Sequence, residues 1–161
     1  SAVSQIRYFE EEDDMTVAKI VFASATGNTE GISEILEDAF KALDVDVERI
    51  EADDADEDSF EDADICVVAT YTDGDGEIPF DLEDFFDELP DQELEGKVFG
   101  VVGSGDSELY PDYFCQAAID FDEAFAKTGA KKGAEVVKIE NAADDEDEEV
   151  LKAFVKALTE A

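Results

Sequence analysis

Short apolar runs and helical repeats of apolar residues alternate along most of this chain of 161 residues. Apolar runs of about four to eight residues are typical of buried strands, whereas apolar residues spaced about three and four apart form one face of a helix. The apolar runs predict five strands, at residues 17–23, 45–50, 65–70, 97–103 and 135–140. The helical repeats predict four helices, at residues 32–43, 79–89, 114–125 and 150–158.

This alternation predicts the fold class and the domain organisation. Strands that alternate with helices favour an α/β domain with a doubly wound parallel sheet, rather than a helical bundle or a β-sandwich. The run at residues 65–70 is apolar on both faces, as expected of a central strand in such a sheet. Residues 1–14 end in five consecutive acidic residues ahead of Met15, the only methionine. We therefore expect a flexible acidic N-terminal extension over residues 1–14 and a single domain over residues 15–161.

Acidic residues outnumber basic ones so strongly that several classes of partner are excluded. The chain has 47 Asp and Glu against 11 Lys and Arg, which gives a formal net charge of −36. A protein with this charge is repelled by nucleic-acid phosphates and by anionic lipid. No apolar stretch is long enough for a membrane span, and the N-terminal residues lack the basic and apolar regions of a signal peptide. We therefore expect neither nucleic acid nor a membrane as a partner.

The absence of histidine restricts the chemistry further. Without His, the chain lacks the usual general acid and base, the Ser-His and Cys-His nucleophile pairs, and the commonest metal ligand. Cys66 and Cys115, the only two cysteines, are far apart and form no CxxC motif. We expect no catalytic residue, no metal site and two free thiols, as in a cytoplasmic protein.

A hydroxyl-rich loop follows the first predicted strand. In an open parallel sheet, ligands bind beyond the carboxyl ends of the strands. Residues 24–29 read Ser-Ala-Thr-Gly-Asn-Thr and lead directly into a helix, so they offer backbone N–H groups, hydroxyls and a positive helix end to a phosphate. They include no Lys or Arg and match neither GxGxxG nor GxxxxGK[ST]. The loop is therefore either a cradle of neutral donors for a phosphate monoester or simply a helix N-cap rich in Ser and Thr.

The loops after the third and fourth predicted strands combine glycine with tyrosine. Residues 70–79 contain Tyr71 and two glycines among acids, and residues 103–115 contain Tyr110 and Tyr113 after two glycines. Glycine permits unusual backbone angles, and tyrosine offers a flat apolar face. A single loop aromatic usually serves packing, but aromatics in both loops that flank a phosphate cradle indicate a flat heterocycle between them.

Together, these motifs closely resemble those of the short-chain flavodoxins. The resemblance extends over residues 15–161 and is carried by Ser-x-Thr-Gly-Asn-Thr at 24–29, Thr-Tyr with Gly-Asp-Gly-Glu-x-Pro within 70–79, and Gly-Ser-Gly-Asp with Tyr-Phe-Cys within 103–115. It implies a flavodoxin-like five-stranded parallel sheet in the order 2-1-3-4-5, with helices on both faces. It also implies a monomeric one-electron carrier that binds FMN non-covalently, rather than an enzyme. Carboxylates around the flavin, with no Lys or Arg to offset them, would disfavour the anionic reduced flavin, so we expect a low-potential carrier.

The resemblance also assigns residues to FMN. The first loop would hold the phosphate, the second would cover the inner face of the flavin, and the third would cover the outer face and donate to the pyrimidine edge. Two positions stay open, because either Tyr71 or Asp73 covers the inner face and either Tyr110 or Tyr113 covers the outer face. In the family, a peptide beside the inner face turns toward flavin N5 when the flavin gains an electron, and Gly74 is suited to that turn. The residues assigned to FMN are Ser24, Ala25, Thr26, Gly27, Asn28, Thr29, Thr70, Tyr71, Thr72, Asp73, Gly74, Ser104, Gly105, Asp106, Tyr110, Tyr113, Phe114 and Cys115.

Three alternatives accompany the carrier hypothesis. A flavodoxin-like NAD(P)H:quinone oxidoreductase is the closest, but such enzymes are usually longer, and this chain shows no site for nicotinamide phosphate. A response-regulator receiver shares the topology but needs acidic residues where residues 23–25 read Ala-Ser-Ala. A flavin-free acidic interaction domain is the third. For the carrier, the expected partners are redox proteins, a reductase and an acceptor oxidoreductase, that dock with basic surfaces near the flavin.

The net charge is larger than the acidity that is general among flavodoxins. Acidic residues occupy every predicted helix and connector. Self-repulsion of this kind destabilises a compact chain in dilute salt, whereas in about 1 M salt the Debye length falls to about 3 Å. We therefore expect a halophilic protein that is stable in molar KCl or NaCl.

Overall fold

The computed structural model describes residues 16–161, so the expected extension over residues 1–14 lies outside the described residues. One parallel sheet forms the centre, in which β1 pairs with both β2 and β3, and β3 also pairs with β4. The order β2-β1-β3-β4-β5 confirms the order expected from the resemblance. The strands are β1 (Val17–Phe22), β2 (Asp46–Glu51), β3 (Ile65–Tyr71), β4 (Val98–Gly105), β5 (Lys131–Lys132) and β6 (Val137–Glu140).

The last position of the sheet holds two short strands rather than the single strand predicted at residues 135–140. Both β5 and β6 pair with β4 in parallel, β5 at its start and β6 at its end. Between them, the Gly133 N–H donates to the Phe99 carbonyl over 3.0 Å. Gly133 also packs so closely on Val98 and Leu158 that a side chain has no room there. This close passage separates the two strands, and the sequence pattern predicted only the second.

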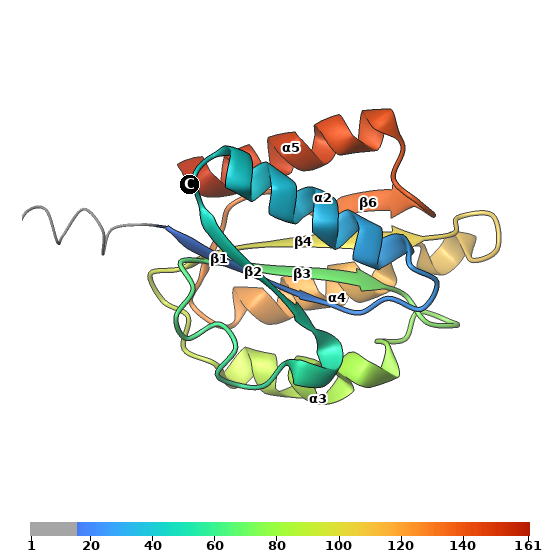
Figure 1. Ribbon diagram of the computed structural model, residues 1–161. Coiled ribbons are helices and arrows are strands. Elements are labelled where there is room, and N and C mark those ends of the chain that lie inside the picture. The colour runs from blue at the N-terminus through green and yellow to red at the C-terminus, as the bar shows by residue number, and fades with distance from the viewer. Residues whose placement is uncertain (1–15) are drawn as a thin grey trace, which may run out of the picture.

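Within residues 16–161, four α-helices cover the two faces of the sheet (Figure 1). α2 and α5 lie on one face, and α3 and α4 lie on the other. They are α2 (Asn28–Ala42), α3 (Glu83–Glu88), α4 (Gln116–Ala126) and α5 (Asp145–Glu160). None of the helices in this part of the chain combines the length and the apolar character that crossing a bilayer requires.

The helices after β3 and β4 are shorter than their apolar repeats predict. The repeat over residues 79–89 forms α3 flanked by two 3₁₀ turns. Pro90 lies in the second of these turns and has no N–H with which to extend an α-helix. The repeat over residues 114–125 becomes helical only at Gln116, because Cys115 before it adopts a left-handed backbone conformation with φ 57°.

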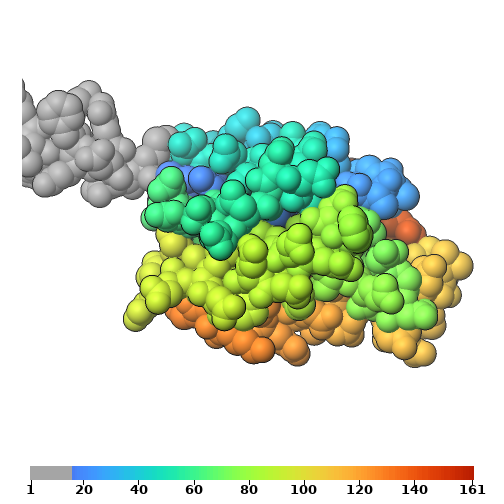
Figure 2. Space-filling model, turned by 90° about the horizontal axis from the view of Figure 1, so that it is seen from below, coloured from blue at the N-terminus to red at the C-terminus, as the bar shows by residue number. Residues whose placement is uncertain are grey.

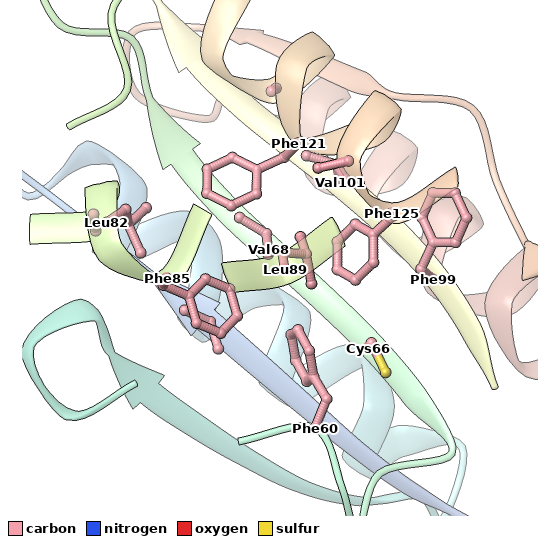
Figure 3. Packing of buried hydrophobic residues seen from close by; sticks show 14 of the residues in the cluster. Phe60, Cys66, Val68, Leu82, Phe85, Leu89, Phe99, Val101, Phe121 and Phe125 are labelled. Atoms are coloured by element: carbon pink, nitrogen blue, oxygen red, sulfur yellow. The ribbon is translucent and has the colours of Figure 1, made fainter. Parts of the chain in front are cut away.

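A group of phenylalanines packs against the sheet on the side of α3 and α4 (Figure 3). The rings of Phe99 and Phe125 stack with their centroids 4.7 Å apart. The ring centroid of Phe60 lies 5.7 Å from those of Phe85 and Phe125. Phe60 belongs to the acidic connector between β2 and β3, yet its side chain is fully buried. Because removing a buried Phe side chain costs about 3–5 kcal/mol, Phe60 anchors a connector whose other residues are mostly exposed acids.

The acidic start of α5 stabilises the layer on the opposite face. Asp144 Oδ1 accepts a hydrogen bond from the Asp147 N–H over 2.8 Å, and Asp147 Oδ2 accepts one from the Asp144 N–H over 3.1 Å. This reciprocal pair forms a capping box. Asp145 and Glu146 add negative charge beside the positive end of the helix. Part of the chain's excess of carboxylates therefore has a structural use.

Two glycines provide a matched test of the packing between the sheet and α5. An added Cβ at Gly100 in β4 would lie 2.6 Å from Phe154 Cζ, whereas one at Gly31 in α2 would meet nothing within 4 Å. We expect Gly100→Ala to lower the free energy of unfolding by about 1–3 kcal/mol through overpacking. We expect Gly31→Ala to raise it by up to about 1 kcal/mol, because alanine is the better helix former. Urea unfolding measures both changes, and a Gly100→Ala variant as stable as the parent would contradict this packing.

Candidate functional site

Three loops meet at one end of the molecule, where β1, β3 and β4 end (Figures 1 and 2). In Figure 2 they gather at the same end in blue, green and yellow-orange. A cavity of about 180 Å³ lies among them. It is lined by Ala25, Thr26, Asn28, Thr29, Tyr71, Thr72, Ser104, Gly105, Asp106, Tyr110 and Asn141.

A small second cavity adjoins the first and shares four residues with it. It is lined by Thr72, Gly74, Gly105, Asp106, Tyr110, Tyr113, Phe114 and Cys115. Most of the residues that the sequence assigned to a ligand therefore border one of these two cavities. Those that border neither are Ser24, Gly27, Thr70 and Asp73. A larger cavity of about 390 Å³ lies between α2 and α5, but none of the three loops and no aromatic side chain lines it.

The loop after β1 leaves the start of α2 open. Gly27 adopts a left-handed conformation with φ 92°, and its N–H donates to Ser24 Oγ over 3.0 Å. Ser24 therefore shapes the turn rather than bordering the cavity. No side chain in the described part of the chain caps α2, so the N–H groups of its first turn remain available at Asn28 and Thr29. An open helix start of this kind binds anions.

A buried hydroxyl pair connects this loop to the end of β4. Thr29 Oγ1 and Ser104 Oγ lie 2.8 Å apart, and either hydroxyl can be the donor. Both side chains are almost completely buried and both border the 180 Å³ cavity. The pair joins residues that are 75 positions apart in the sequence. This hydrogen bond therefore joins the start of α2, which follows the loop after β1, directly to the end of β4.

Tyr71, the last residue of β3, borders the cavity, whereas Asp73 in the loop that follows does not. Asp73 is exposed and exchanges two backbone hydrogen bonds with Glu77, of 2.9 and 2.8 Å. This pair closes a tight turn in which Gly74 has φ 45°. Burial of the Tyr71 phenol, with the nearby carboxylates of Asp73 and Asp81, raises the pKa of Tyr71. The phenol therefore stays protonated at neutral pH.

The loop after β4 is organised by Asp106. One oxygen of its side chain, Oδ1, accepts hydrogen bonds from the N–H groups of Glu108 and Leu109, each over 3.0 Å. Its carbonyl accepts from the Tyr110 N–H over 3.0 Å. Tyr110 borders both cavities, whereas Tyr113 borders only the small one. Tyr113 also lies against Gly76 of the neighbouring loop, where an added Cβ would be 2.8 Å from its ring.

Sequence reasoning missed two residues that follow or end β6. Asn141 borders the cavity, has φ 54°, and donates its N–H to the Gly105 carbonyl over 2.8 Å. The carboxylate of Glu140 accepts hydrogen bonds from both the N–H and the hydroxyl of Ser107. Together they tie the loop after β4 to the end of β6. An Asn directly after a strand was the available signal, because Asn tolerates the left-handed conformation better than most residues.

The site holds no ionised thiol. Burial raises the pKa of Cys66 to about 12 and that of Cys115 to about 11. Because the thiolate is the reactive form, neither cysteine is a nucleophile at neutral pH. Within residues 16–161, no three His, Cys, Asp or Glu side chains are arranged to hold a metal ion. The arrangement suits binding of an anion and a flat ring rather than acid–base or nucleophilic chemistry.

Comparison with known proteins identifies the family. A family model described as Flavodoxin matches residues 20–154, which is more than half of the chain. The chain belongs to the flavodoxin family. Probable flavodoxin 1 of Bacillus subtilis is 38% identical to it over 145 residues, which cover 89% of this chain and 90% of that relative. Membership supports the function that the motifs implied, an electron carrier that binds FMN.

Solved structures of flavodoxins have the same fold. A short-chain flavodoxin associated with a PDU bacterial microcompartment has a TM-score of 0.88 and 42% identity, and the match covers 91% of this chain and 98% of that chain. The flavodoxin of Streptococcus pneumoniae TIGR4 has a TM-score of 0.86 and 50% identity, with 90% and 99% coverage. These flavodoxins favour the carrier over the quinone oxidoreductase that the sequence left as an alternative.

Proposed function

We propose that this chain is a low-potential carrier of single electrons whose FMN lies in the cavity among the three loops. The observation that carries the proposal is the lining of that cavity. The lining combines an open helix start and hydroxyl groups with two tyrosines, Tyr71 and Tyr110, and it contains no Lys, Arg or His. Such a lining suits a phosphate joined to a flat heterocycle, and it pairs no nucleophile with the His base that commonly activates one.

The first loop would hold the phosphate of FMN through neutral donors. The free N–H groups at the start of α2 lie at the positive end of the helix, where negative charge is stabilised. Thr26 and Thr29, which both carry a hydroxyl, border the same cavity. Ser24 and Gly27 would act by keeping the turn open, because the Gly27 N–H bonds to Ser24 Oγ and leaves the next N–H groups unused.

The isoalloxazine ring would lie between the other two loops. Tyr71 would cover the inner face and Tyr110 the outer face, because both side chains border the 180 Å³ cavity. Gly105 would let the backbone approach the pyrimidine edge. An added Cβ at Gly105 would be 3.1 Å from Phe114 Cδ1 and 3.4 Å from the Cys115 N, so glycine keeps this edge of the cavity open.

The charge around the cavity supports a low reduction potential. Bound FMN supplies the redox chemistry, and the protein tunes it. Residues 24–30, 70–79 and 103–115 contain no Lys or Arg, but they include acids such as Asp75 and Asp106. A field of carboxylates disfavours added negative charge on the reduced cofactor, which lowers its potential.

Two exposed apolar side chains support docking of redox partners. Phe80 is 79% exposed and Leu109 is 71% exposed, and each lies in a segment that follows a cavity-lining strand. Acidic residues surround both in the sequence. We propose that a reductase and an acceptor oxidoreductase dock here with a basic rim around an apolar contact, and that the carrier is a cytoplasmic monomer.

Reconstitution tests the proposal. The purified chain, freed of any flavin, should bind FMN and acquire the absorption and quenched fluorescence of a protein-bound flavin. It should then pass electrons to an acceptor protein only when a separate NADPH-dependent reductase is present. Consumption of NADPH with a quinone and no reductase would instead establish the oxidoreductase. Failure to bind any flavin would leave an acidic interaction domain.

Gly74→Ala tests the turn beside the inner flavin face. Gly74 has φ 45°, a conformation that L side chains adopt at a cost of about 1 kcal/mol or more, although nothing lies within 4 Å of an added Cβ. Restricting this peptide should hinder its turn toward flavin N5 and bring the two one-electron reduction potentials closer together. A stepwise reductive titration followed by absorption measures their separation.

Gly96→Ala is the matched control for that variant. Gly96 has φ 87° and also meets nothing within 4 Å, but it precedes β4 at the opposite edge of the sheet from the cavity. It should lower stability by a similar amount and leave both potentials unchanged. Identical potentials in the Gly74→Ala variant and the parent would remove Gly74 from the proposal.

We further propose that the protein is halophilic. Its 47 carboxylates face only 11 basic residues, and among residues 16–161 one of these bases, Lys132, contacts two acids. Lys132 lies 3.1 Å from Asp122 and 3.2 Å from Glu135. Most exposed acids are therefore left to repel one another, and only dissolved cations can screen them.

The thermal midpoint should rise by several degrees between about 10 mM and about 1 M KCl, because screening removes the repulsion over this range. The triple variant E34Q/D62N/E93Q is the control, since these exposed acids make no hydrogen bond or ion pair within residues 16–161. It should be more stable than the parent in dilute salt and gain less from KCl. A midpoint that does not depend on salt would contradict the halophilic character and leave FMN binding untouched.

A further inference from the structure

The buried hydroxyl pair at the edge of the cavity has a hydrogen atom left over. Thr29 is 2% exposed and Ser104 is 4% exposed, and their oxygens lie 2.8 Å apart. Each hydroxyl carries one hydrogen, and the bond between them uses only one of the two. Neither hydroxyl has a second hydrogen-bond partner among residues 16–161. A buried donor without an acceptor costs about 1–3 kcal/mol, so the remaining hydrogen needs an acceptor.

The cavity is the place from which that acceptor would come. Both Thr29 and Ser104 border it. Thr29 lies in the first turn of α2, where the open helix start attracts negative charge. Ser104 lies at the end of β4, beside Tyr71 in the register of the sheet. The direction of the hydrogen bond between Thr29 and Ser104 therefore decides which of the two hydroxyls can donate to a ligand in the cavity.

We propose that Ser104 is a positioning residue that donates to Thr29 Oγ1 and so leaves the Thr29 hydrogen for an FMN phosphate oxygen. The opposite direction would place a lone pair of Thr29, rather than a hydrogen, toward the anion. A phosphate oxygen is the stronger acceptor, because hydrogen bonds to charged groups are about twice as strong as neutral ones. This inference rests on the proposed function, since it assigns a role to a residue that would act through Thr29.

The direction of one hydroxyl matters here because the phosphate loop has no cation. Residues 24–30 contain no Lys or Arg and include Glu30, whose charge opposes an anion. Binding must therefore depend on neutral donors that already point the right way. Ser104 would also connect the two halves of the site, because it belongs to the strand that continues into the loop bearing Tyr110.

Riboflavin separates this role from a merely structural one, because it has the same ring as FMN and no phosphate. We expect Ser104→Ala to weaken FMN binding about fivefold, the usual effect of one hydrogen bond, and to leave riboflavin binding unchanged. Thr29→Val should do the same, whereas Thr29→Ser, which keeps the hydroxyl, should bind FMN as the parent does. Because Ser104 acts through Thr29, the double variant S104A/T29V should bind FMN no more weakly than Thr29→Val alone. Fluorescence titration of the flavin-free variants measures these constants, and urea unfolding shows that each one folds.

Several results would overturn the proposal. Equal losses of FMN and riboflavin affinity in Ser104→Ala would show that Ser104 supports the ring or the loop instead. Unchanged FMN affinity in that variant, or additive losses in the double variant, would also overturn it. Competition by inorganic phosphate probes the phosphate end alone, and Ser104→Ala should weaken it by the same factor as FMN. A parent chain that binds no FMN would overturn the proposed function itself. A parent chain that binds FMN, with a Ser104→Ala variant that binds it equally well, would overturn only the role of Ser104.

Discussion

The pairing of β3 with β1 on one side and β4 on the other is the constraint on which the site depends. In the register of the sheet, Ala69 lies beside both Phe22 and Val102, so β1 ends at the level of Ala69, and β3 and β4 end two and three residues beyond it. Their loops must then start side by side. Because β3 is buried on both faces, a one-residue shift of its register would move side chains such as Val67 and Val68 to the opposite face and break their packing, so the core protects the alignment of the loops.

The sequence predicted best what depends on local apolar patterns. The strand predicted at residues 65–70 differs from β3 by one residue, because a run that is apolar on both faces has no other stable place than the centre of a parallel sheet. The burial of Phe60 and the strand β5 were not predicted, because polar residues flank both in the sequence and their positions depend on residues far away along the chain. Phe60 is buried by Phe85 and Phe125, and Lys131 and Lys132 pair with β4 through the backbone alone.

The candidate site was predictable where backbone chemistry is local. A Gly inside a hydroxyl-rich turn before a helix indicates an anion site, and the structure leaves that helix start open. The positions of residues in the sequence could not decide which residue covers each face of the flavin, because some residues of these loops belong to turns and do not border the cavity. Asp73, for example, belongs to a tight turn that its two backbone hydrogen bonds with Glu77 close. Asn141 escaped notice because it reaches the site from β6, far along the chain.

The charge of the chain affects the cofactor and the fold through the same repulsion. A net charge of −36 opposes compaction, and it also opposes the binding of an anionic phosphate and the gain of electrons by the flavin. The open helix start and the buried hydroxyls act within a hydrogen-bond length, where salt screens little, whereas most carboxylates act over distances at which molar salt screens strongly. High salt should therefore favour folding and FMN binding together, while the acids nearest the ring still hold the potential low.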